Sequence, residues 1–448
     1  MFIITLKIKH HTNKGIFTVS QLEIEKKKYN QLNEWVSHLN IDAPHSSNQP
    51  SINLPYQRWF RFKEAYSPKL VIDIIDKVGE IPSHVFDPFG GCGTTAITSQ
   101  FLGVTPTAIE VNPFLADLTQ SKLTRYDFGQ LLCEKDALCL HVDSITISEA
   151  EIEKYPRTFC EPGFKERWLF PASIFKRILQ YKMCIERIED ENCRRLFRVI
   201  LGSTLIPVSN VFISGKGRKY KQNWELKQSS VKDLDKLFNQ NLQRALNDIA
   251  AFNEKHNGYT LLRGDCREQV KNIEKFDFSM FSPPYPNSFD YTDVYNVELW
   301  LLGYIGSHGD CRDLRSNTLR SHVQVRRTYE NKNAQSELMN ETLAQLDLHR
   351  QELWHKELPE MIGAYFCDLA GLLEEMRTKI TDNGNVIMII GDSAYKSVRV
   401  PVADILAEIA LTKGYKIKEK SVLRKLRVSA QQGGDSSLDE SMLWIQPN

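Results

Sequence analysis

The sequence predicts an α/β fold, a Rossmann-like sheet that carries a large, mainly helical insertion. A strand, a glycine-rich loop, a helix and a second strand follow one another within residues 84–111, the order of a parallel βαβ unit. Residues 125–255 then show mostly helical patterns, and this segment is too long for a plain connection between two strands. Strand patterns return at 259–262 and again at 384–392. We therefore expect one sheet interrupted by an insertion.

Local patterns place the individual elements of this fold. Apolar residues at helical spacing predict helices over 69–78, 94–102, 173–188, 231–252, 358–380 and 402–411. Short apolar runs predict strands over 84–86, 107–111, 259–262, 276–280 and 384–392, with a further strand pair after Tyr415. Upstream, residues 3–9 indicate a strand and 21–39 a charged helix, followed by a polar, proline-bearing linker over 43–50.

The composition is that of an ordinary globular protein, and it limits the classes of function. Hydrophobic residues make up 42% of the 448 residues and charged residues 25%, while the formal net charge is +1. A nearly neutral chain is not globally basic, so local patches would have to meet a polyanionic partner. The nine cysteines include no Cys-x-x-Cys pair. This argues against a zinc ribbon or a disulfide framework and favours reduced thiols in the cytosol.

Two apolar stretches resemble targeting or membrane segments at first sight. Residues 1–11 interleave lysines with apolar residues and offer no small-residue cleavage site, which is not the pattern of a signal peptide. Residues 196–213 are long enough for a membrane span, but they contain Arg198 and Pro207, which favours a buried helix that runs into a loop. The sequence therefore predicts a soluble, cytoplasmic protein without a membrane segment.

The glycine-rich loop of the βαβ unit is the first segment with a chemical signature. It is Asp-Pro-Phe-Gly-Gly-Cys-Gly-Thr-Thr over 87–95. Glycines between a strand and a helix let a ligand approach the backbone, and the first helical turn offers unpaired N–H groups. The loop is not Gly-x-Gly-x-x-Gly and no Gly-Lys-Ser/Thr follows, so phosphate binding is not the natural interpretation. Glu110, 23 positions after Asp87, ends the next strand and suits two ribose hydroxyls.

Two further segments end predicted strands of the same sheet. Arg-Gly-Asp-Cys over 263–266 follows the strand at 259–262, and Asp265 can accept from the exocyclic amine of a bound adenine. Phe-Ser-Pro-Pro-Tyr over 281–285 follows the run at 276–280. Each proline fixes φ and removes a backbone donor, so two in series make a stiff turn whose carbonyls point in set directions. In open α/β sheets, ligands bind at this carboxyl end of the strands.

The Ser-Pro-Pro-Tyr turn suits methylation of an exocyclic amino group on a nucleic-acid base. The lone pair of that nitrogen is delocalised into the ring, which makes it a poor nucleophile. If Ser282 Oγ and the carbonyl of Pro283 accept its two hydrogens, the nitrogen is drawn toward tetrahedral geometry and its lone pair is aimed at a methyl donor. Tyr285 can stack on the base, which must first leave its duplex by base flipping.

These segments resemble motifs I and IV of the S-adenosylmethionine-dependent amino-methyltransferases that act on DNA. The loop at 87–95 is similar to motif I, the turn at 282–285 to motif IV, and the Tyr-Ser-Pro-Lys-Leu-Val run at 66–71 to motif X. Serine at the first position of motif IV is most typical of the cytosine-N4 branch, whereas the adenine-N6 branch more often has Asp or Asn. The resemblance covers roughly 65–125, 258–305 and 384–430.

The resemblance implies a class I methyltransferase sheet that binds S-adenosyl-L-methionine. It implies that Glu110 holds the ribose, that Asp265 holds the adenine and that the segment 62–70 closes the methionine pocket. The candidate cofactor-binding residues are Tyr66, Ser67, Asp87, Pro88, Phe89, Gly91, Gly93, Thr94, Glu110, Asn112, Asp265 and Cys266. The candidate catalytic residues are Ser282, Pro283, Pro284 and Tyr285. Methyl transfer from a sulfonium needs no metal, and His322 and the pair His10-His11 lack ligand spacing, so we expect none.

Two basic segments fall in the insertions and not in the sheet. Nine Lys or Arg residues against one acidic residue lie between Arg194 and Lys232, and five arginines against one aspartate lie between Arg312 and Arg327. Lysine and arginine on glycine-flanked loops suit contact with phosphates, and arginine can read guanine in the major groove. The candidate nucleic-acid-binding residues are Lys216, Arg218, Lys219, Lys221, Arg320, Arg326 and Arg327.

These assignments divide the chain. We expect an N-terminal appendage at 1–50, the cofactor-binding half of the methyltransferase domain at 51–124 and a helical DNA-recognition subdomain at 125–255. The catalytic half follows at 256–305, then a second DNA-contacting insertion at 306–356 and the C-terminal part of the sheet at 357–448.

The resemblance thus implies methylation of cytosine N4 in a specific sequence of double-stranded DNA, as the protective half of a restriction–modification pair with a separate endonuclease. Adenine N6, structured RNA and a non-catalytic DNA-binding protein on the same fold stay open as alternatives. Ring-carbon methylation of cytosine is disfavoured because the chain has no Pro-Cys dipeptide to supply the nucleophile. Each motif, taken alone, also has a purely structural explanation. The glycine loop could simply turn the chain, the Ser-Pro-Pro-Tyr segment could be a rigid turn, and the basic segments could be ordinary solvated charge.

Overall fold

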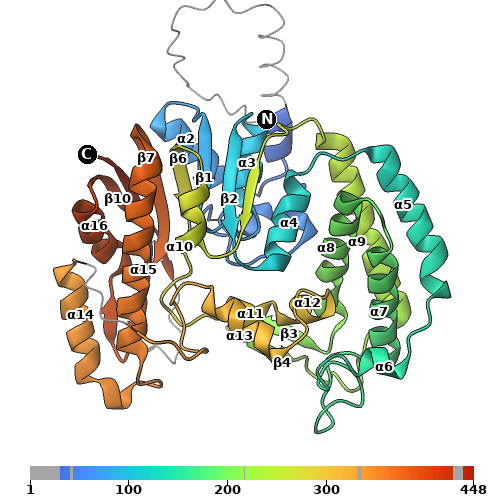
Figure 1. The fold of residues 1–448 in the computed structure, drawn as a ribbon. Helices are drawn as coiled ribbons and strands as arrows, with labels where there is room; N and C mark the ends of the chain where they lie inside the picture. Colours follow the sequence, from blue (N-terminus) through green and yellow to red (C-terminus); the bar gives the residue numbers. More distant parts are fainter. Residues whose placement is uncertain (1–30, 41–43, 216, 330–334, 427–436) are drawn as a thin grey trace, which may run out of the picture.

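The computed structural model describes residues 31–40, 44–215, 217–329, 335–426 and 437–448. Its centre is a seven-stranded sheet in the order β10-β11-β7-β6-β1-β2-β5 (Figure 1). The strands are β1 (His84–Asp87), β2 (Thr105–Glu110), β5 (Thr260–Arg263), β6 (Phe276–Phe281), β7 (Ile380–Gly391), β10 (Tyr415–Leu426) and β11 (Leu438–Pro447). The five strands from β5 to β7 in this order pair in parallel, whereas β11 runs antiparallel to both of its neighbours. This topology confirms the predicted Rossmann-like fold.

The chain winds outward from β1 in two directions. β2 and β5 extend the sheet on one side of β1, and β6 and β7 extend it on the other. The direction of winding therefore reverses between β1 and β6, and such a switch point is where open α/β sheets bind ligands. The loop after β1 and the turn after β6 lie at this point.

Helices cover both faces of the sheet. Val85 of β1 packs with α2 (Pro68–Val78), whereas the next residue, Phe86, packs with α15 (Leu358–Lys379) and α16 (Val402–Thr412). Successive side chains of a strand point to opposite faces, so these helices lie on opposite sides of the sheet. The remaining helices next to the sheet are α3 (Thr94–Phe101), α4 (Pro113–Leu123) and α10 (Cys266–Gln269).

Local sequence explains the ends of the first of these helices. Ser67 Oγ accepts from the backbone N–H of Lys69 at 3.2 Å, and Pro68 occupies the first helical position, where its missing N–H is no loss. Gly79 ends α2 with φ of 87°, a conformation that glycine adopts without strain. Ser67 therefore acts as a helix cap.

The insertion between β2 and β5 is mainly helical, as predicted. Its helices are α5 (Phe128–His141), α6 (Glu149–Ile152), α7 (Ala172–Glu186), α8 (Glu191–Val208) and α9 (Val231–Phe252), and it adds the hairpin of β3 (Val211–Ser214) and β4 (Gly217–Tyr220). Figure 1 shows α5, α7, α8 and α9 standing side by side beyond α4, with the short α6 below α7. The apolar run at 196–213 forms the buried end of α8 and then β3. No helix of the described residues is long and apolar enough to cross a membrane.

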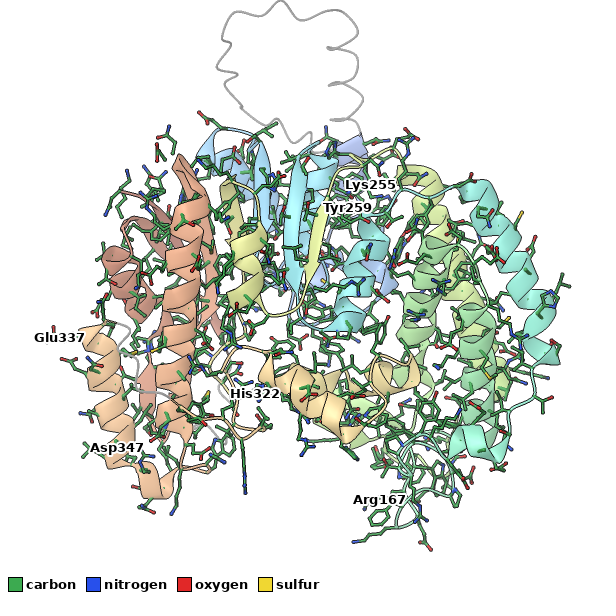
Figure 2. The ribbon with its side chains drawn as sticks, viewed as in Figure 1. Arg167, Lys255, Tyr259, His322, Glu337 and Asp347 are labelled. Carbon is green, nitrogen blue, oxygen red and sulfur yellow. The ribbon has the colours of Figure 1, made fainter. Side chains whose placement is uncertain are left out.

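A second insertion separates β6 from β7. Between these strands lie α11 (Tyr291–Val294), α12 (Asn296–Leu301), α13 (His308–Ser316) and α14 (Glu337–Leu348), of which α13 and α14 fall within the second insertion predicted at 306–356. Figure 2 places His322 in the middle of the molecule, after α13, whereas Glu337 and Asp347 lie at its edge on α14. A short hairpin, β8 (Ser393–Tyr395) and β9 (Val398–Val400), follows β7. The second insertion therefore reaches from the middle of the molecule to its edge.

The described residues before α2 pack into the core. Trp35 is fully buried and stacks on Phe101 with 4.1 Å between ring centroids. Asn48 donates to the carbonyl of Phe62 at 2.5 Å, and Pro50 is buried. Within this segment, Ser46, Ser47 and Pro50 are therefore buried against the folded chain, whereas Pro44 and Gln49 are exposed, so the prediction of a free linker over 43–50 is wrong for its buried residues.

The predicted sheet strands and helices are confirmed, and the strand pair after Tyr415 is the antiparallel pair β10 and β11. The predicted strand at 3–9 lies outside the described residues, as does the first part of the helix at 21–39, whose residues 31–36 are helical. One hydrophobic core joins Trp35, α3, the helical insertion and Cys311. The division of the chain at 125 and 255 stays a prediction, and this shared core crosses both boundaries.

Candidate active site

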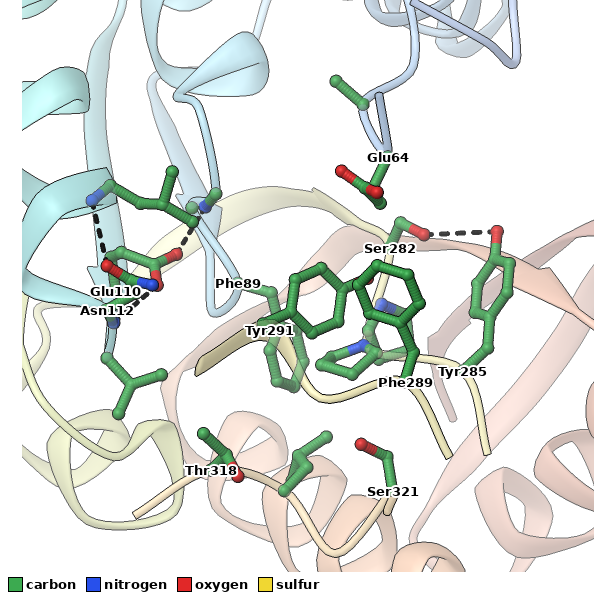
Figure 3. A pocket seen from close by; sticks show the side chains of 18 of the residues that line it. Glu64, Phe89, Glu110, Asn112, Ser282, Tyr285, Phe289, Tyr291, Thr318 and Ser321 are labelled. Carbon is green, nitrogen blue, oxygen red and sulfur yellow. Dashed lines mark hydrogen bonds between the residues drawn. The ribbon is translucent and has the colours of Figure 1, made fainter. Parts of the chain in front are cut away.

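A cavity of about 400 Å³ opens at the switch point of the sheet. Its walls come from the segment before α2, the loop after β1, the end of β2, the turn after β6 and the second insertion. This volume is in the usual range for a small-molecule site. Figure 3 shows Glu110 and Asn112 at one end and Ser282 and Tyr285 at the other, with aromatic rings between them.

Neighbouring side chains pack closely against two glycines of the loop after β1. Gly91 has φ of 51°, and a Cβ atom there would lie 3.5 Å from the ring of Phe62. Gly93 has φ of 78°, and a Cβ atom there would lie 2.9 Å from the side chain of Thr119. Both positions require the left-handed region that glycine tolerates. The loop is thus fixed by packing, and it presents backbone to the cavity.

Two buried carboxyl groups flank this loop. Glu110 accepts from the N–H of Gly91 at 2.6 Å and from that of Asn112 at 2.8 Å. Asp87 accepts from the N–H of Phe89 at 2.9 Å. Burial raises the pKa of Asp87 to about 7 and that of Glu110 to about 7. Desolvation disfavours the charged form, so both groups hold negative charge at a cost that a cationic or hydrogen-donating ligand would offset.

Asn112 carries an unused donor at the same end. Its Oδ1 accepts from the N–H groups of Phe114 at 3.0 Å and Leu115 at 3.3 Å and so caps α4. Its Nδ2 is buried and has no hydrogen-bond partner among the described residues. A buried amide that finds no partner costs free energy, so this donor is available to a polar ligand atom.

The Ser-Pro-Pro-Tyr turn forms the opposite end. Ser282 Oγ donates to the hydroxyl of Tyr285 at 3.4 Å, and that hydroxyl donates to Glu440 Oε1 at 3.1 Å. Glu440 is paired with Arg424 through Nη2 at 3.0 Å. Figure 3 shows the hydroxyls of Ser282 and Tyr285 facing each other. The serine is therefore the first member of a polar chain that extends to β11.

Packing fixes the position of the tyrosine. A Cβ atom on Gly391 of β7 would lie 2.4 Å from the ring of Tyr285, so the ring rests directly on this glycine. The hydroxyl of Tyr395 donates to the carbonyl of Pro286 at 2.8 Å and holds the chain just after the turn. The turn is rigid on both sides.

Aromatic residues form the wall between the two ends. Phe289 and Tyr291 contact each other with centroids 4.6 Å apart, and Phe89 packs against Phe281 at 5.6 Å. Figure 3 places Phe89, Tyr291 and Phe289 between Glu110 and Ser282. Glu64 lies beside Ser282 in this view and accepts from the hydroxyl of Tyr295 at 3.0 Å. Burial raises the pKa of Glu64.

Most of the predicted site residues line this cavity. They are Tyr66, Asp87, Pro88, Phe89, Gly91, Thr94, Glu110, Asn112, Cys266, Ser282, Pro283, Pro284 and Tyr285. Tyr66 also bonds through its hydroxyl to Thr95 and, at 3.2 Å, to the carbonyl of Met280. The structure thus brings together residues from four distant parts of the sequence.

Three predicted cofactor-binding residues do not line the cavity. Ser67 caps α2, as described above, and Gly93 begins α3 behind the loop. Asp265 caps α10 and accepts from the guanidinium of Arg267, with Nε at 2.9 Å from both carboxylate oxygens. Gly264 and Cys266 line the cavity on either side of it. The carboxylate of Asp265 is therefore turned to Arg267, a partner two residues away, which corrects its expected place.

The predicted nucleic-acid-binding residues differ strongly in exposure. Lys219 and Arg326 are exposed. Four others point at groups of the protein: Arg218 bonds to Asn296, Lys221 donates to the carbonyl of Pro207 at 2.7 Å, Arg320 pairs with Asp368 at 2.7 Å and Arg327 donates to Thr318 at 3.0 Å. Lys216 lies outside the described residues. Counting charges therefore overestimated the free basic surface.

Several cavity residues were not singled out from the sequence. Glu440 and Arg424 lie on strands with no distinctive motif, and Thr318 and Leu319 belong to the second insertion. His322, considered from the sequence only as a metal ligand, also lines the cavity. Glu64 falls inside the segment 62–70, so its acidic character amid aromatic neighbours was a usable signal. No group of three metal-ligating side chains was found among the residues that the structure describes.

Comparison with known proteins gives relatives over most of the chain. The Type II methyltransferase M.AvaI, from Nostoc sp. (strain PCC 7120) and from Anabaena variabilis, is 25% identical over 430 residues, covering 86% of this chain and 84% of the relative. The Type II methyltransferase M.BsoBI of Geobacillus stearothermophilus is 24% identical over 475 residues, covering 93% and 89%. No protein-family model matches the chain.

Solved structures give weaker matches. The glycopeptide N-methyltransferase MtfA, complexed with S-adenosyl-L-methionine, has a TM-score of 0.27 and 6% identity over 85% of this chain and 87% of its own. The rRNA methyltransferase aviRa of Streptomyces viridochromogenes has a TM-score of 0.27 and 11% identity over 85% of each chain. These TM-scores are too low to carry an argument.

Proposed function

We propose that this protein is an S-adenosyl-L-methionine-dependent DNA methyltransferase that transfers a methyl group to the exocyclic N4 of cytosine in a specific duplex sequence. The observation that carries this proposal is one cavity with Glu110 at one end and Ser282 and Pro283 at the other. The similarity to proteins named as Type II methyltransferases over most of the chain supports DNA as the substrate.

The residues at the Glu110 end fit the cofactor. Hydroxyl groups of a ribose would donate to Glu110, and the buried Nδ2 of Asn112 offers a donor beside it. Two buried carboxyls with raised pKa values, Asp87 and Glu110, favour a ligand of positive charge. When bound, S-adenosylmethionine supplies a methyl group activated by a sulfonium. Phe89, Gly91 and Tyr66 would enclose its methionine part.

The other end would hold the target amine. Ser282 Oγ and the carbonyl of Pro283 would each accept one of its hydrogens, which draws the lone pair out of the base ring and toward the donor. Phe289 and Tyr291 offer aromatic surface for the base, and Tyr285 offers the face of its ring that does not rest on Gly391. A base held here has left its duplex. Serine at position 282 favours cytosine over adenine.

DNA would reach the cavity across the insertions. Lys219 on β4 and Arg326 after α13 are exposed and suited to phosphate contact. We further propose that the protein protects host DNA as one half of a restriction–modification pair, with an endonuclease that acts separately.

Incubation of plasmid DNA with the purified protein and labelled S-adenosylmethionine tests the proposal. Digestion to nucleosides and mass spectrometry should identify N4-methylcytosine. N6-methyladenine would overturn the choice of base, and label found only in RNA would overturn the substrate class. An absence of any methylated nucleic acid would overturn the activity itself.

A further inference from the structure

The polar chain behind Ser282 has a direction. Glu440 is buried and paired with Arg424, so it is a carboxylate, and a carboxylate only accepts hydrogen bonds. The hydroxyl of Tyr285 must therefore give its hydrogen to Glu440, 3.1 Å away. What remains on the tyrosine oxygen is a lone pair, and Ser282 Oγ donates to it at 3.4 Å.

This direction determines which hydrogen-bonding role Ser282 can play in the cavity. Because its single hydrogen is given to Tyr285, Ser282 Oγ presents lone pairs and no hydrogen toward the cavity. A free serine hydroxyl could equally donate. The hydroxyl of Ser282 is thus restricted to the role of hydrogen-bond acceptor on its cavity side. The restriction comes from Tyr285 of the turn, Glu440 of β11 and Arg424 of β10.

We propose that Tyr285 and Glu440 are positioning residues that hold Ser282 as an acceptor for the target amine and carry away the proton that the amine loses. This inference rests on the proposed function and adds to it a task for the tyrosine hydroxyl that is separate from stacking. Stacking uses the ring of Tyr285, whereas this task uses only its oxygen.

The proton transfer balances along the chain. As the amine nitrogen gains a methyl group, one of its N–H bonds breaks and that proton bonds to Ser282 Oγ. The former proton of Ser282 moves to the oxygen of Tyr285, and that of Tyr285 moves to Glu440 Oε1. Each oxygen keeps the electron pair of the O–H bond that it loses. The net result is a neutral methylated amine and a protonated Glu440, which then returns its proton to solvent.

Arg424 completes the arrangement from β10. Its guanidinium bonds to both oxygens of Glu440, with Nε donating to Oε2 and Nη2 donating to Oε1 at 3.0 Å. Such a two-point pair fixes the carboxylate plane as well as its charge. The rotation of Glu440 is thereby restricted, so Oε1 stays aimed at the tyrosine.

Tyr285→Phe separates the ring from the hydroxyl, and Glu440→Gln removes the proton acceptor while preserving shape. Both variants should lower kcat for plasmid methylation on the order of 10²-fold, a typical contribution of general acid–base catalysis. The KM for DNA and the Kd for S-adenosylmethionine should stay within about twofold. Because the residues act as a unit, the double variant should be no slower than the slower single variant.

The matched control is Tyr415→Phe. Tyr415 is a fully buried tyrosine at the start of β10 whose hydroxyl donates to the carbonyl of Leu373 at 2.9 Å, outside the cavity. Tyr415→Phe also removes a buried tyrosine hydroxyl and the hydrogen bond that it donates, although Tyr285→Phe loses in addition the bond accepted from Ser282. Tyr415→Phe should keep wild-type kcat. Thermal melting of all variants confirms that they are folded.

Wild-type kcat in Tyr285→Phe would show that only the ring matters and would overturn the inference, while the proposed function would stand. Wild-type kcat in Glu440→Gln, or a double variant slower by the product of the single effects, would also overturn it. A wild-type protein that methylates no DNA would overturn both the inference and the function on which it rests.

Discussion

The two ends of the cavity are built in different ways. At the Glu110 end, the backbone groups that bond to the carboxylate come from Gly91 and Asn112, all within or next to the βαβ unit of β1, α3 and β2. At the Ser282 end, the partners are Tyr285, Glu440 and Arg424, and the last two lie on the C-terminal strands β11 and β10. One end is therefore local in sequence, and the other depends on the register of strands far apart in the chain.

This difference predicts how substitutions at each end of the cavity should affect the protein. A local site that uses mainly backbone groups tolerates changes elsewhere in the sheet. A site assembled from several strands is sensitive to any change that shifts one strand against another. We expect the first end to control affinity for the cofactor and the second to control the rate.

Loss of the serine hydroxyl should have the largest effect. Ser282→Ala should lower kcat on the order of 10³-fold, because one acceptor for the target amine is lost, while the Kd for S-adenosylmethionine stays near wild type. Single-turnover methylation and calorimetry measure the two quantities. Ser279→Ala, at a buried position of the strand β6 that precedes the turn, is the control and should keep its rate. A large loss of cofactor affinity in Ser282→Ala would contradict the separation of the two ends.

Glu110→Ala should act at the opposite end. Removal of a charged acceptor should cost roughly 1.5–3 kcal/mol of cofactor affinity, about a 10- to 150-fold rise in Kd. At saturating cofactor, kcat should change far less. Glu268→Ala, on the exposed side of α10, serves as the comparison and should bind normally. A variant with normal Kd but low kcat would mean that Glu110 belongs functionally to the other end.

The pH dependence of cofactor binding provides a further test of the contrast between the Glu110 end and the Ser282 end. Burial raises the pKa of both Asp87 and Glu110 to about 7, so below this pH the ligand-free protein holds them as neutral acids. A ligand that needs the carboxylates releases these protons, so affinity should rise as the pH rises to about 7 and level off above about 8. The slope should be roughly tenfold per pH unit for each proton released. Calorimetry in buffers of different ionisation enthalpy counts the protons, and a flat profile would contradict the assignment.

A smaller effect is expected outside the cavity. Lys219→Ser with Arg326→Ser should weaken DNA binding and reduce the slope of log K against log salt by about one for each phosphate that is no longer neutralised. Lys221→Ser and Arg320→Ser change side chains that bond inside the protein, so their salt slopes should match the wild type. Fluorescence anisotropy with a labelled duplex at several salt concentrations distinguishes the pairs. Equal slopes in all variants would remove these segments from the DNA interface.

The sequence was most informative where structure is local. The loop at 87–95 and the turn at 282–285 carry their geometry in glycines and prolines, and both line the cavity as expected. Glu440 could not be found this way, because it reaches Tyr285 only through the antiparallel pairing of β11 with β7. Asp265 shows the opposite failure. Its position at a strand end was predicted, but the competing guanidinium of Arg267 takes its carboxylate.

The role of the basic segments in DNA binding stays a prediction, and the structure shows only which of their side chains face solvent. A count of lysines and arginines cannot distinguish a side chain that faces solvent from one that bonds to a carbonyl, as Lys221 does, or to a buried aspartate, as Arg320 does. The partner of Arg320, Asp368, lies on α15, far along the chain from the segment that was counted. Long-range pairing again limited what local composition could predict.

The place of β10 and β11 in the chain gives the molecule an order of assembly. During synthesis these two strands leave the ribosome after every other strand of the described sheet, and a domain generally folds as a unit. The Glu110 end also draws on later segments, because Gly264 and Cys266, which follow β5, line the same cavity. Arg424 and Glu440 arrive much later. The polar chain behind Ser282 can therefore form only after β10 and β11 have joined the sheet.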